Sequence, residues 1–206
     1  MRIAYRRATL DEASVSPSPV AQFKRWFDDA VNSGIVEPNA MLLATAHPTR
    51  GPSARCVLLK SLRRGEFVFF TNYTSRKAQD IAAQKRVALT FYWAELERQV
   101  RIEGLAHKVS RAESQRYFRK RPRDSQLGAL VSPQSTVIHD RAALESTLQK
   151  VAVSLRGSPV PCPLHWGGYA VRPLRVEFWQ GRPGRLHDRI EYRRRKGGWR
   201  IVRLAP

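Results

Sequence analysis

The chain has 206 residues, with 37 Lys and Arg against 17 Asp and Glu, which gives a formal net charge of +20. This length suits one domain with a substantial core. No apolar run is long enough to span a bilayer, and the first residues, MRIAYRRATLDEAS, lack the apolar stretch of a secretory signal. The two cysteines, Cys56 and Cys162, lie far apart without CxxC spacing, which argues against a zinc site or a disulfide framework. We therefore expect a reduced, cytoplasmic protein of one domain, residues 1–206, without a metal site.

The positive charge favours polyanionic partners, and nucleic acid is the first class to consider. The cations, however, are spread over nearly every segment, and the one dense run, RRRK at 193–196, precedes Gly197 and Gly198. That order is typical of a hairpin tip in solvent. There is no helix-turn-helix pattern, zinc-finger spacing or RNP-type motif, so nucleic-acid binding stays an alternative without a specific motif behind it.

The predicted elements begin with a helix in SPSPVAQFKRWFDDAVNSG, residues 16–34. Ser18 suits its N-cap, Pro19 its first position and Gly34 its C-terminal stop. One face of this helix is apolar, and its members are Val20, Phe23, Phe27, Ala30 and Val31.

Strand-like runs separated by short turns such as LRRG follow, at 40–46, 53–60, 66–72, 87–93 and 98–109. Ser110 with Glu113 forms a capping-box pattern that opens a helix, and a further helix is predicted from Asp140 to about Leu155. The tail returns to strands at 169–181, 185–195 and 199–205. Short turns favour antiparallel pairing. The predicted fold class is α+β, with an antiparallel β-barrel-like core and peripheral helices.

The segment FFTNYTSRKAQDI, residues 69–81, predicts a buried strand, a turn and a helix whose N-cap is Ser75. Its first helical residues are Arg76 and Lys77, although cations are unfavourable at the positive end of a helix dipole by roughly 0.3–1 kcal/mol. Either an anion is bound there, or both side chains bend into solvent.

Three further basic clusters could recognise anions. The first is the pair Arg55 and Lys60 at the two ends of the strand SARCVLLK. The second supplies hydroxyl and guanidinium donors suited to phosphate, from Tyr117, Arg121, Arg123 and Ser125. The third would share one face of a strand beginning at 185, and its members are Arg185, His187 and Arg189, with Trp179 just before them. Each cluster could instead be a solvated basic surface. The residues alone indicate two or three phosphate-sized sites.

Several blocks of the sequence resemble the pyridoxamine 5′-phosphate oxidase family: RCVLLK, FFTNYTSRKA, LERQVRIEG, RYFRKRPRDSQLGALVSPQS, WGGY, EFWQG, RLHDR and the terminal RLAP. The resemblance runs in order along the chain. It implies an FMN-binding split barrel that forms a homodimer, with each active site across the subunit interface.

The resemblance also implies roles for single residues. The FMN contacts of the same chain would be Arg55, Lys60, Phe70, Thr71, Arg76, Lys77 and Gln99. The FMN contacts from the partner subunit would be Gln134, Ser135, Trp179 and Arg189. The substrate phosphate would be held by Lys60, Tyr117, Arg121 and Ser125. Arg185 and His187 would be the catalytic pair over the substrate ring. Residues 1–18 would be an N-terminal segment free to move, of which Arg2 to Tyr5 would close on the substrate.

The implied reaction oxidises pyridoxamine or pyridoxine 5′-phosphate to pyridoxal 5′-phosphate, with O2 as the electron acceptor and H2O2 as the second product. Phe70 stands where many members have Tyr, which matters little if the contact there is made by the backbone. The alternative is a split-barrel relative with FMN and another substrate, against which the complete phosphate set argues. Two bound phosphates, at about −2 each, leave most of the +20 charge unexplained.

Overall fold

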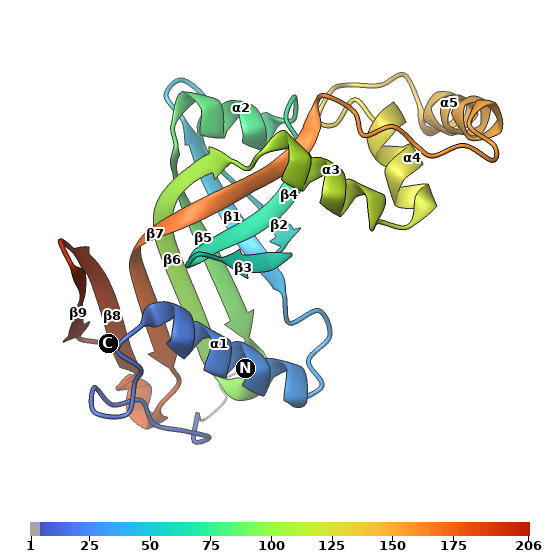
Figure 1. Ribbon diagram of the computed structural model, residues 1–206. Coiled ribbons are helices and arrows are strands. Elements are labelled where there is room, and N and C mark those ends of the chain that lie inside the picture. Colours follow the sequence, from blue (N-terminus) through green and yellow to red (C-terminus); the bar gives the residue numbers. More distant parts are fainter. Residues whose placement is uncertain (1–4) are drawn as a thin grey trace.

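The computed structural model describes residues 5–206, and Arg2, with the rest of the predicted N-terminal contact before Tyr5, lies outside them. These residues form a nine-stranded antiparallel sheet that curls into an open barrel (Figure 1). Its central path runs in the order β2-β1-β5-β6-β7-β4-β3, with β8 and β9 added beside β7. The strands are β1 Ala40–His47, β2 Gly51–Leu58, β3 Ser61–Arg63, β4 Glu66–Asn72, β5 Arg86–Trp93, β6 Arg98–Lys108, β7 Trp166–Gln180, β8 Asp188–Arg195 and β9 Gly198–Arg203.

Strand β7 is the branch point of the sheet. On one side it pairs with β6 along its length. On the other side its first half pairs with β4, and its second half, Arg175–Gln180, pairs with β8. A 15-residue strand covers roughly 45 Å along its path at about 3.3 Å per residue. The two ends of β7 therefore belong to two different parts of the molecule, as Figure 1 shows.

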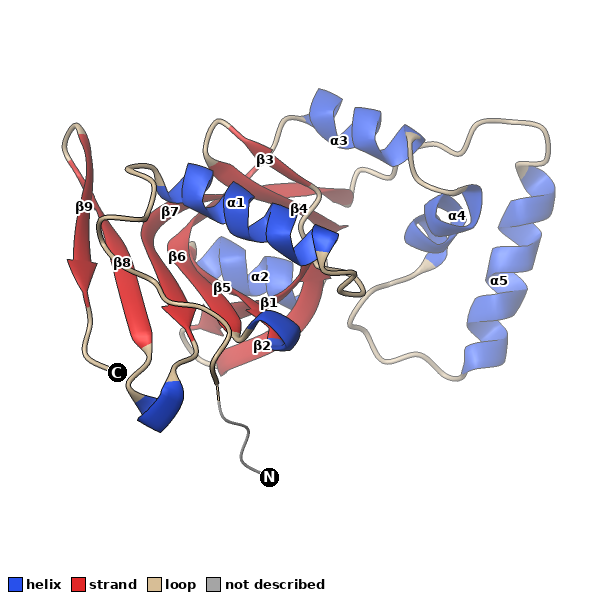
Figure 2. Cartoon of the chain, turned by 90° about the horizontal axis from the view of Figure 1, so that it is seen from below, coloured by secondary structure: helices blue, strands red, loops and turns tan. Residues whose placement is uncertain are grey.

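The helices are peripheral, as the sequence predicted. They are α1 Pro19–Asn32, α2 Arg76–Ala83, α3 Arg111–Arg119, α4 Arg123–Val131 and α5 Arg141–Ser154. Helix α1 packs against the barrel, whereas α4 and α5 extend to one side (Figure 2). Two predicted N-caps are confirmed, because the side chains of Ser18 and Ser110 each accept a backbone N–H of their helix. The helix predicted from Asp140 is also confirmed, and Asp140 caps it through a backbone N–H that its side chain accepts. Among residues 5–206, no helix has the length and apolar character needed to cross a membrane.

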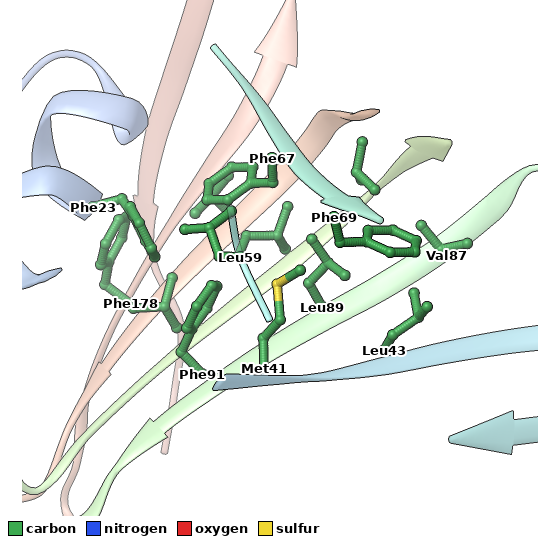
Figure 3. Packing of buried hydrophobic residues seen from close by; sticks show 14 of the residues in the cluster. Phe23, Met41, Leu43, Leu59, Phe67, Phe69, Val87, Leu89, Phe91 and Phe178 are labelled. Carbon is green, nitrogen blue, oxygen red and sulfur yellow. The ribbon is translucent and has the colours of Figure 1, made fainter. Parts of the chain in front are cut away.

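The core fills the barrel between α1 and the inward faces of β1, β4 and β5. Phe23 of α1 packs against Phe67 and Phe91 there, with ring centroids 5.0 Å and 4.9 Å away, and Figure 3 shows this cluster. The predicted apolar face of α1 was wrong at one edge: Val31 is 50% exposed, while Trp26 is buried. The buried positions recur every three or four residues from Pro19, so the helix is rotated slightly from the face that we expected.

Other boundaries differ from the prediction as well, by up to three residues at several strand ends. The first two residues of the LRRG turn belong to the short strand β3, and Arg64 and Gly65 with positive φ close its hairpin with β4. The last long strand begins at Asp188 and not at 185, because Pro183–Arg185 form a 3-10 turn in which Arg185 is left-handed. The predicted alternation from Arg185 through His187 is therefore wrong. The predicted hairpin tip is confirmed, with β8 and β9 joined at Lys196 and Gly197.

Candidate functional site

A cleft of about 750 Å³ opens where β2 and β4 end, facing α3, α4 and the loop after α4. It gathers most of the residues that the sequence assigned to cofactor and phosphate binding. Those that line it are Arg55, Lys60, Phe70, Thr71, Lys77, Tyr117, Arg121, Ser125 and Gln134. Segments far apart in the sequence thus meet in one chain.

One wall of the cleft is a stack of three aromatic rings. Phe70 of β4 lies 4.0 Å from Tyr117 of α3 and 5.3 Å from Trp166 of β7, measured between ring centroids, with the planes nearly parallel. A Cβ on Gly168 would come within 2.8 Å of the Phe70 ring, so a larger residue there would displace Phe70. The stack is a flat, rigid surface that holds Tyr117 toward the cleft.

Arg121 gives the clearest indication that the cleft binds an anion. Its guanidinium lies 4.8 Å from the Trp166 ring centroid, and its Nη1 is buried without a hydrogen-bond partner among the described residues. Burial lowers the pKa of Arg121. A buried nitrogen of a cationic group without a hydrogen-bond partner is costly, so this atom favours an anion as a ligand of the cleft.

At the start of α2, the side chains of Arg76 and Lys77 point in different directions. Lys77 is half-buried in the cleft, with Nζ 2.9 Å from Gln134 Oε1, and burial together with the nearby Arg55 lowers the pKa of Lys77. Arg76 is exposed and lines a neighbouring hollow with Ser135. Ser75 is the N-cap residue, but the predicted cap bond was wrong, because its hydroxyl instead donates to the Asn72 carbonyl at 2.7 Å.

The Arg55 guanidinium is held by hydrogen bonds to residues of β1 and β2. Its Nη1 donates to the Leu43 carbonyl at 3.1 Å and to Thr45 Oγ1 at 2.7 Å, and its Nη2 donates to Ser53 Oγ at 2.6 Å. Burial lowers the pKa of Arg55, the charge of Asp80 opposes that shift, and Arg76 adds to it. The guanidinium is therefore fixed in one orientation before any ligand arrives.

Asp80 is a residue of this site that the sequence reasoning missed. It lies on the inward face of α2 with its side chain 1% exposed, accepts Arg50 Nη2 at 2.8 Å and Thr45 Oγ1 at 2.8 Å, and stands 3.9 Å from Arg55. Burial raises the pKa of Asp80, but the hydrogen bonds and charges of its partners outweigh burial and leave that pKa lowered. The signal in the sequence was an acid flanked by Ala78 and Ile81, the buried residues of the same helix.

The remaining predicted residues form a second group, which we call the distal group, at the other end of β7. Its members are Gln99, Trp179, Arg185, His187 and Arg189. In the sheet, Gln99 is opposite Trp179 and Trp179 is opposite Arg189. The Trp179 and His187 rings are 4.6 Å apart, and Arg189 Nε donates to Glu177 Oε1 at 2.8 Å, a bond that raises the pKa of Arg189.

Two expectations about which chain supplies each residue need correction. Gln99 was grouped with the cofactor contacts of the cleft, but its register places it beside Trp179. Gln134 was expected to arrive from a partner, yet it lines the cleft of its own chain and also accepts Thr71 Oγ1 at 3.2 Å. The loop after α4 returns to the start of α2, which brings Gln134 and Ser135 there without a second subunit.

No member of the distal group lines the cleft. Trp166, which borders the cleft, is the first residue of β7, whereas Trp179 lies one residue before the end of the same strand. In the order of the sheet, β7 is also four strands away from β2, which lines the cleft. One chain therefore presents two separate parts of the predicted site on different surfaces.

Solved structures share this architecture. A crystal structure of PhzG from Burkholderia lata, in complex with tetrahydrophenazine-1-carboxylic acid, has a TM-score of 0.90 at 28% identity and covers 96% of this chain and 98% of its own. An FMN-binding protein from Nostoc punctiforme, described as pyridoxamine 5′-phosphate oxidase-related, has a TM-score of 0.73 at 18% identity over 93% of this chain. The fold is thus the split barrel of FMN-binding proteins.

The sequence comparisons place the chain more narrowly. Residues 27–154 match the family profile described as pyridoxamine 5′-phosphate oxidase, and residues 166–206 match the pyridoxine 5′-phosphate oxidase C-terminal dimerisation region. Two curated relatives named pyridoxine/pyridoxamine 5′-phosphate oxidase align over all of this chain. The protein from Rubrobacter xylanophilus is 55% identical over 95% of its own length. The protein from Ralstonia nicotianae, numbered 1 in its name, is 54% identical over 97% of its own length. The chain belongs to the pyridoxamine 5′-phosphate oxidase family and is an oxidoreductase of the flavoprotein class.

The support of Arg55 by Asp80 can be tested by pH-dependent stability. Because the folded pKa of Asp80 lies below its ordinary value of 3.8, its contribution is complete above that pH and is lost as the pH falls through the folded pKa. We expect Asp80→Asn to lower the free energy of unfolding at pH 7 by about 2 kcal/mol. Denaturant titrations at fixed protein concentration should show this deficit shrinking below pH 3.8.

The control is Asp29→Asn, which removes an exposed ion pair with Arg98 and should cost less than about 1 kcal/mol. An Asp80→Asn deficit that is independent of pH would contradict the electrostatic role of Asp80.

Proposed function

We propose that the protein is an FMN-dependent oxidase that converts pyridoxamine 5′-phosphate and pyridoxine 5′-phosphate to pyridoxal 5′-phosphate, with O2 reduced to H2O2. The observation that carries the proposal is the cleft, in which Arg121 Nη1 has no hydrogen-bond partner among residues 5–206 and whose volume and charge suit a phosphorylated ligand. The names of the curated relatives at 54–55% identity support the same substrates.

The residues present fit FMN. Lys77 is desolvated beside Arg55, so a phosphate at the start of α2 would relieve their repulsion and gain the helix dipole. The cofactor contacts would be Arg55, Lys60, Phe70, Thr71, Arg76, Lys77, Gln134 and Ser135. Bound FMN would accept electrons from the substrate C4′ carbon and pass them to oxygen.

The substrate phosphate would be bound at the α3–α4 end of the cleft. Arg121 and Lys60 supply the charge there, and the hydroxyl groups of Tyr117 and Ser125 can donate hydrogen bonds. Charge-assisted bonds of this kind contribute roughly 1.5–3 kcal/mol each. Fixing the phosphate sets how far the substrate ring extends along the cleft, which is the orientation that transfer to a cofactor requires.

We assign the catalytic roles to Arg185 and His187 of the partner subunit. His187 Nδ1 accepts the backbone N–H of Arg182 at 3.1 Å, so the proton of the neutral ring is on Nε2 and points away from that bond. Arg185 is exposed on its turn, with no ion pair among the described residues, and is free to contact substrate on another surface. Gln99, Trp179 and Arg189 of the partner subunit would complete the cofactor site.

A second candidate function follows from the structural similarity to PhzG, a protein solved with a carboxylic acid that carries no phosphate. In that case the chain would bind FMN but oxidise another substrate. The set Lys60, Tyr117, Arg121 and Ser125 favours the phosphorylated substrate, because an unphosphorylated one would leave Arg121 Nη1 unpaired.

The function is tested by the visible spectrum of FMN-loaded protein without oxygen. Pyridoxamine 5′-phosphate should bleach the flavin band, and air should restore it. If only tetrahydrophenazine-1-carboxylic acid bleaches the band, the second candidate is correct. If FMN does not bind, both candidates fail.

The phosphate site is tested by Arg121→Ala. We expect the KM for pyridoxamine 5′-phosphate to rise at least about tenfold, the value of one charge-assisted hydrogen bond, while any turnover of unphosphorylated pyridoxamine stays the same. Steady-state kinetics with both substrates measure this. The control is Arg116→Ala, an exposed cation on α3 outside the cleft, and an equal loss with both substrates would argue against a phosphate contact.

The catalytic assignment is tested by Arg185→Ala, which we expect to lose most turnover while it binds FMN as the wild type does. Stopped-flow reduction and flavin titration separate the two properties. Arg195→Ala, at the exposed hairpin tip, is the control for lost positive charge. Joint loss of FMN and activity in Arg185→Ala would refute the assignment.

A further inference from the structure

A buried carboxylate outside both groups holds the start of the described chain. Glu97 Oε2 accepts the backbone N–H of Arg6 at 2.9 Å and that of Arg7 at 3.0 Å. Glu97 lies between β5 and β6, is 8% exposed, and has a left-handed backbone with φ of 55°. Its carbonyl accepts the N–H of Gly181 at 2.7 Å, so Glu97 is fixed directly to the end of β7.

These bonds place Tyr5 on the distal group. The Tyr5 ring centroid is 5.8 Å from that of Trp179 and 5.7 Å from that of His187. A Cβ on Gly181 would lie 2.7 Å from Tyr5 Cγ and 3.0 Å from Glu97 Cβ. The close approach of Tyr5 therefore depends on the glycine after β7 and on the carboxylate beneath it.

A second carboxylate fixes the other end of residues 5–10, which we call the strap. Asp188 Oδ2 accepts the N–H of Leu10 at 3.0 Å, and Asp188 Oδ1 accepts Arg203 Nη1 at 2.8 Å. Between the two anchors, Arg182 Nη1 donates to the Ala8 carbonyl at 3.1 Å. Both anchors belong to segments that carry or adjoin the distal group, so the strap and that group form one surface.

We propose that Glu97 is a positioning residue for the oxidation, because its carboxylate docks the strap and thereby holds Tyr5 against His187 and Trp179. The expected effect on KM rests on the proposed function, whereas the docking of the strap does not. Ionised acceptors make stronger hydrogen bonds than neutral ones, and Glu97 binds main-chain donors, so it fixes the path of the strap independently of the Arg6 and Arg7 side chains. Tyr5 then covers the aromatic pair and limits the positions open to substrate.

The kinetic test is Glu97→Ala, compared with Glu95→Ala. Glu95 is an exposed acid in the same turn, and its replacement should change nothing. In Glu97→Ala we expect the KM for pyridoxamine 5′-phosphate to rise about tenfold, as the loss of charge-assisted bonds implies, with kcat changed less than about threefold and FMN affinity unchanged. Glu97→Gln keeps an acceptor oxygen and should recover part of the KM.

A double-mutant cycle with Tyr5→Ala shows whether Glu97 acts through the strap. If it does, Glu97→Ala raises KM no further in the Tyr5→Ala background, since interacting positions are not additive. Additive effects on KM, or a loss of FMN in Glu97→Ala, would overturn the proposal.

A readout that needs no activity separates this proposal from the proposed function. Trypsin cleaves after Arg6 and Arg7, and docking should slow that cleavage, which intact-mass spectrometry detects as loss of the N-terminal peptide. We expect faster cleavage in Glu97→Ala than in Glu95→Ala and the wild type. Equal rates would refute the docking role, whereas a wild type inactive toward both phosphorylated substrates would refute only the proposed function.

Discussion

The double pairing of strand β7 is the constraint on which the rest of the structure depends. Because its first half pairs with β4 and its second half with β8, the cleft and the distal group stand at opposite ends of one strand. Residues 166–206, which contain β7, β8 and β9, match a dimerisation region. In the function proposed above, a second copy of the chain supplies the distal group to each cleft, and the double pairing of β7 is what separates the two parts of the site within one chain.

The two parts of the site differ in their electrostatics. In the cleft, cations are held without matching anions: Lys77 is desolvated beside Arg55, and Arg121 Nη1 has no partner among the described residues. In the distal group, the cation Arg189 is already paired with Glu177. The cleft is thus prepared to gain charge from its ligands, whereas Arg189 is held in place by its own chain.

Carboxylates take a supporting role throughout. Asp80 orients the arginines under α2, Glu97 and Asp188 fix the strap, and Glu177 holds Arg189. None of the four lines the cleft. The chain has far fewer acids than bases, so only some of its cations have a carboxylate partner that holds the side chain in one position.

Local signals in the sequence were sufficient for much of the fold. The N-caps Ser18 and Ser110 were predictable because capping is a matter of neighbouring residues, and alternation gave most strands. Gln99 was misplaced because its neighbours are set by the register of β6 on β7, which no local pattern contains. The turn at Arg185 was missed for a similar reason, since RLHDR reads equally well as a strand. Asp80 and Glu97 depend on contacts with distant segments, so their roles appear only in three dimensions.

A mixed dimer of two impaired subunits, assayed at pyridoxamine 5′-phosphate well below the wild-type KM, tests the two-subunit site most directly. Arg121→Ala damages the cleft and Arg185→Ala damages the distal group, so co-expression with different tags allows the mixed dimer to be isolated. If each site combines the cleft of one subunit with the distal group of the other, one of the two sites is intact and the dimer recovers about half of the wild-type activity, as two-fold symmetry requires. If the mixed dimer is no more active than its parent variants, each site is made by a single chain, and the account is wrong.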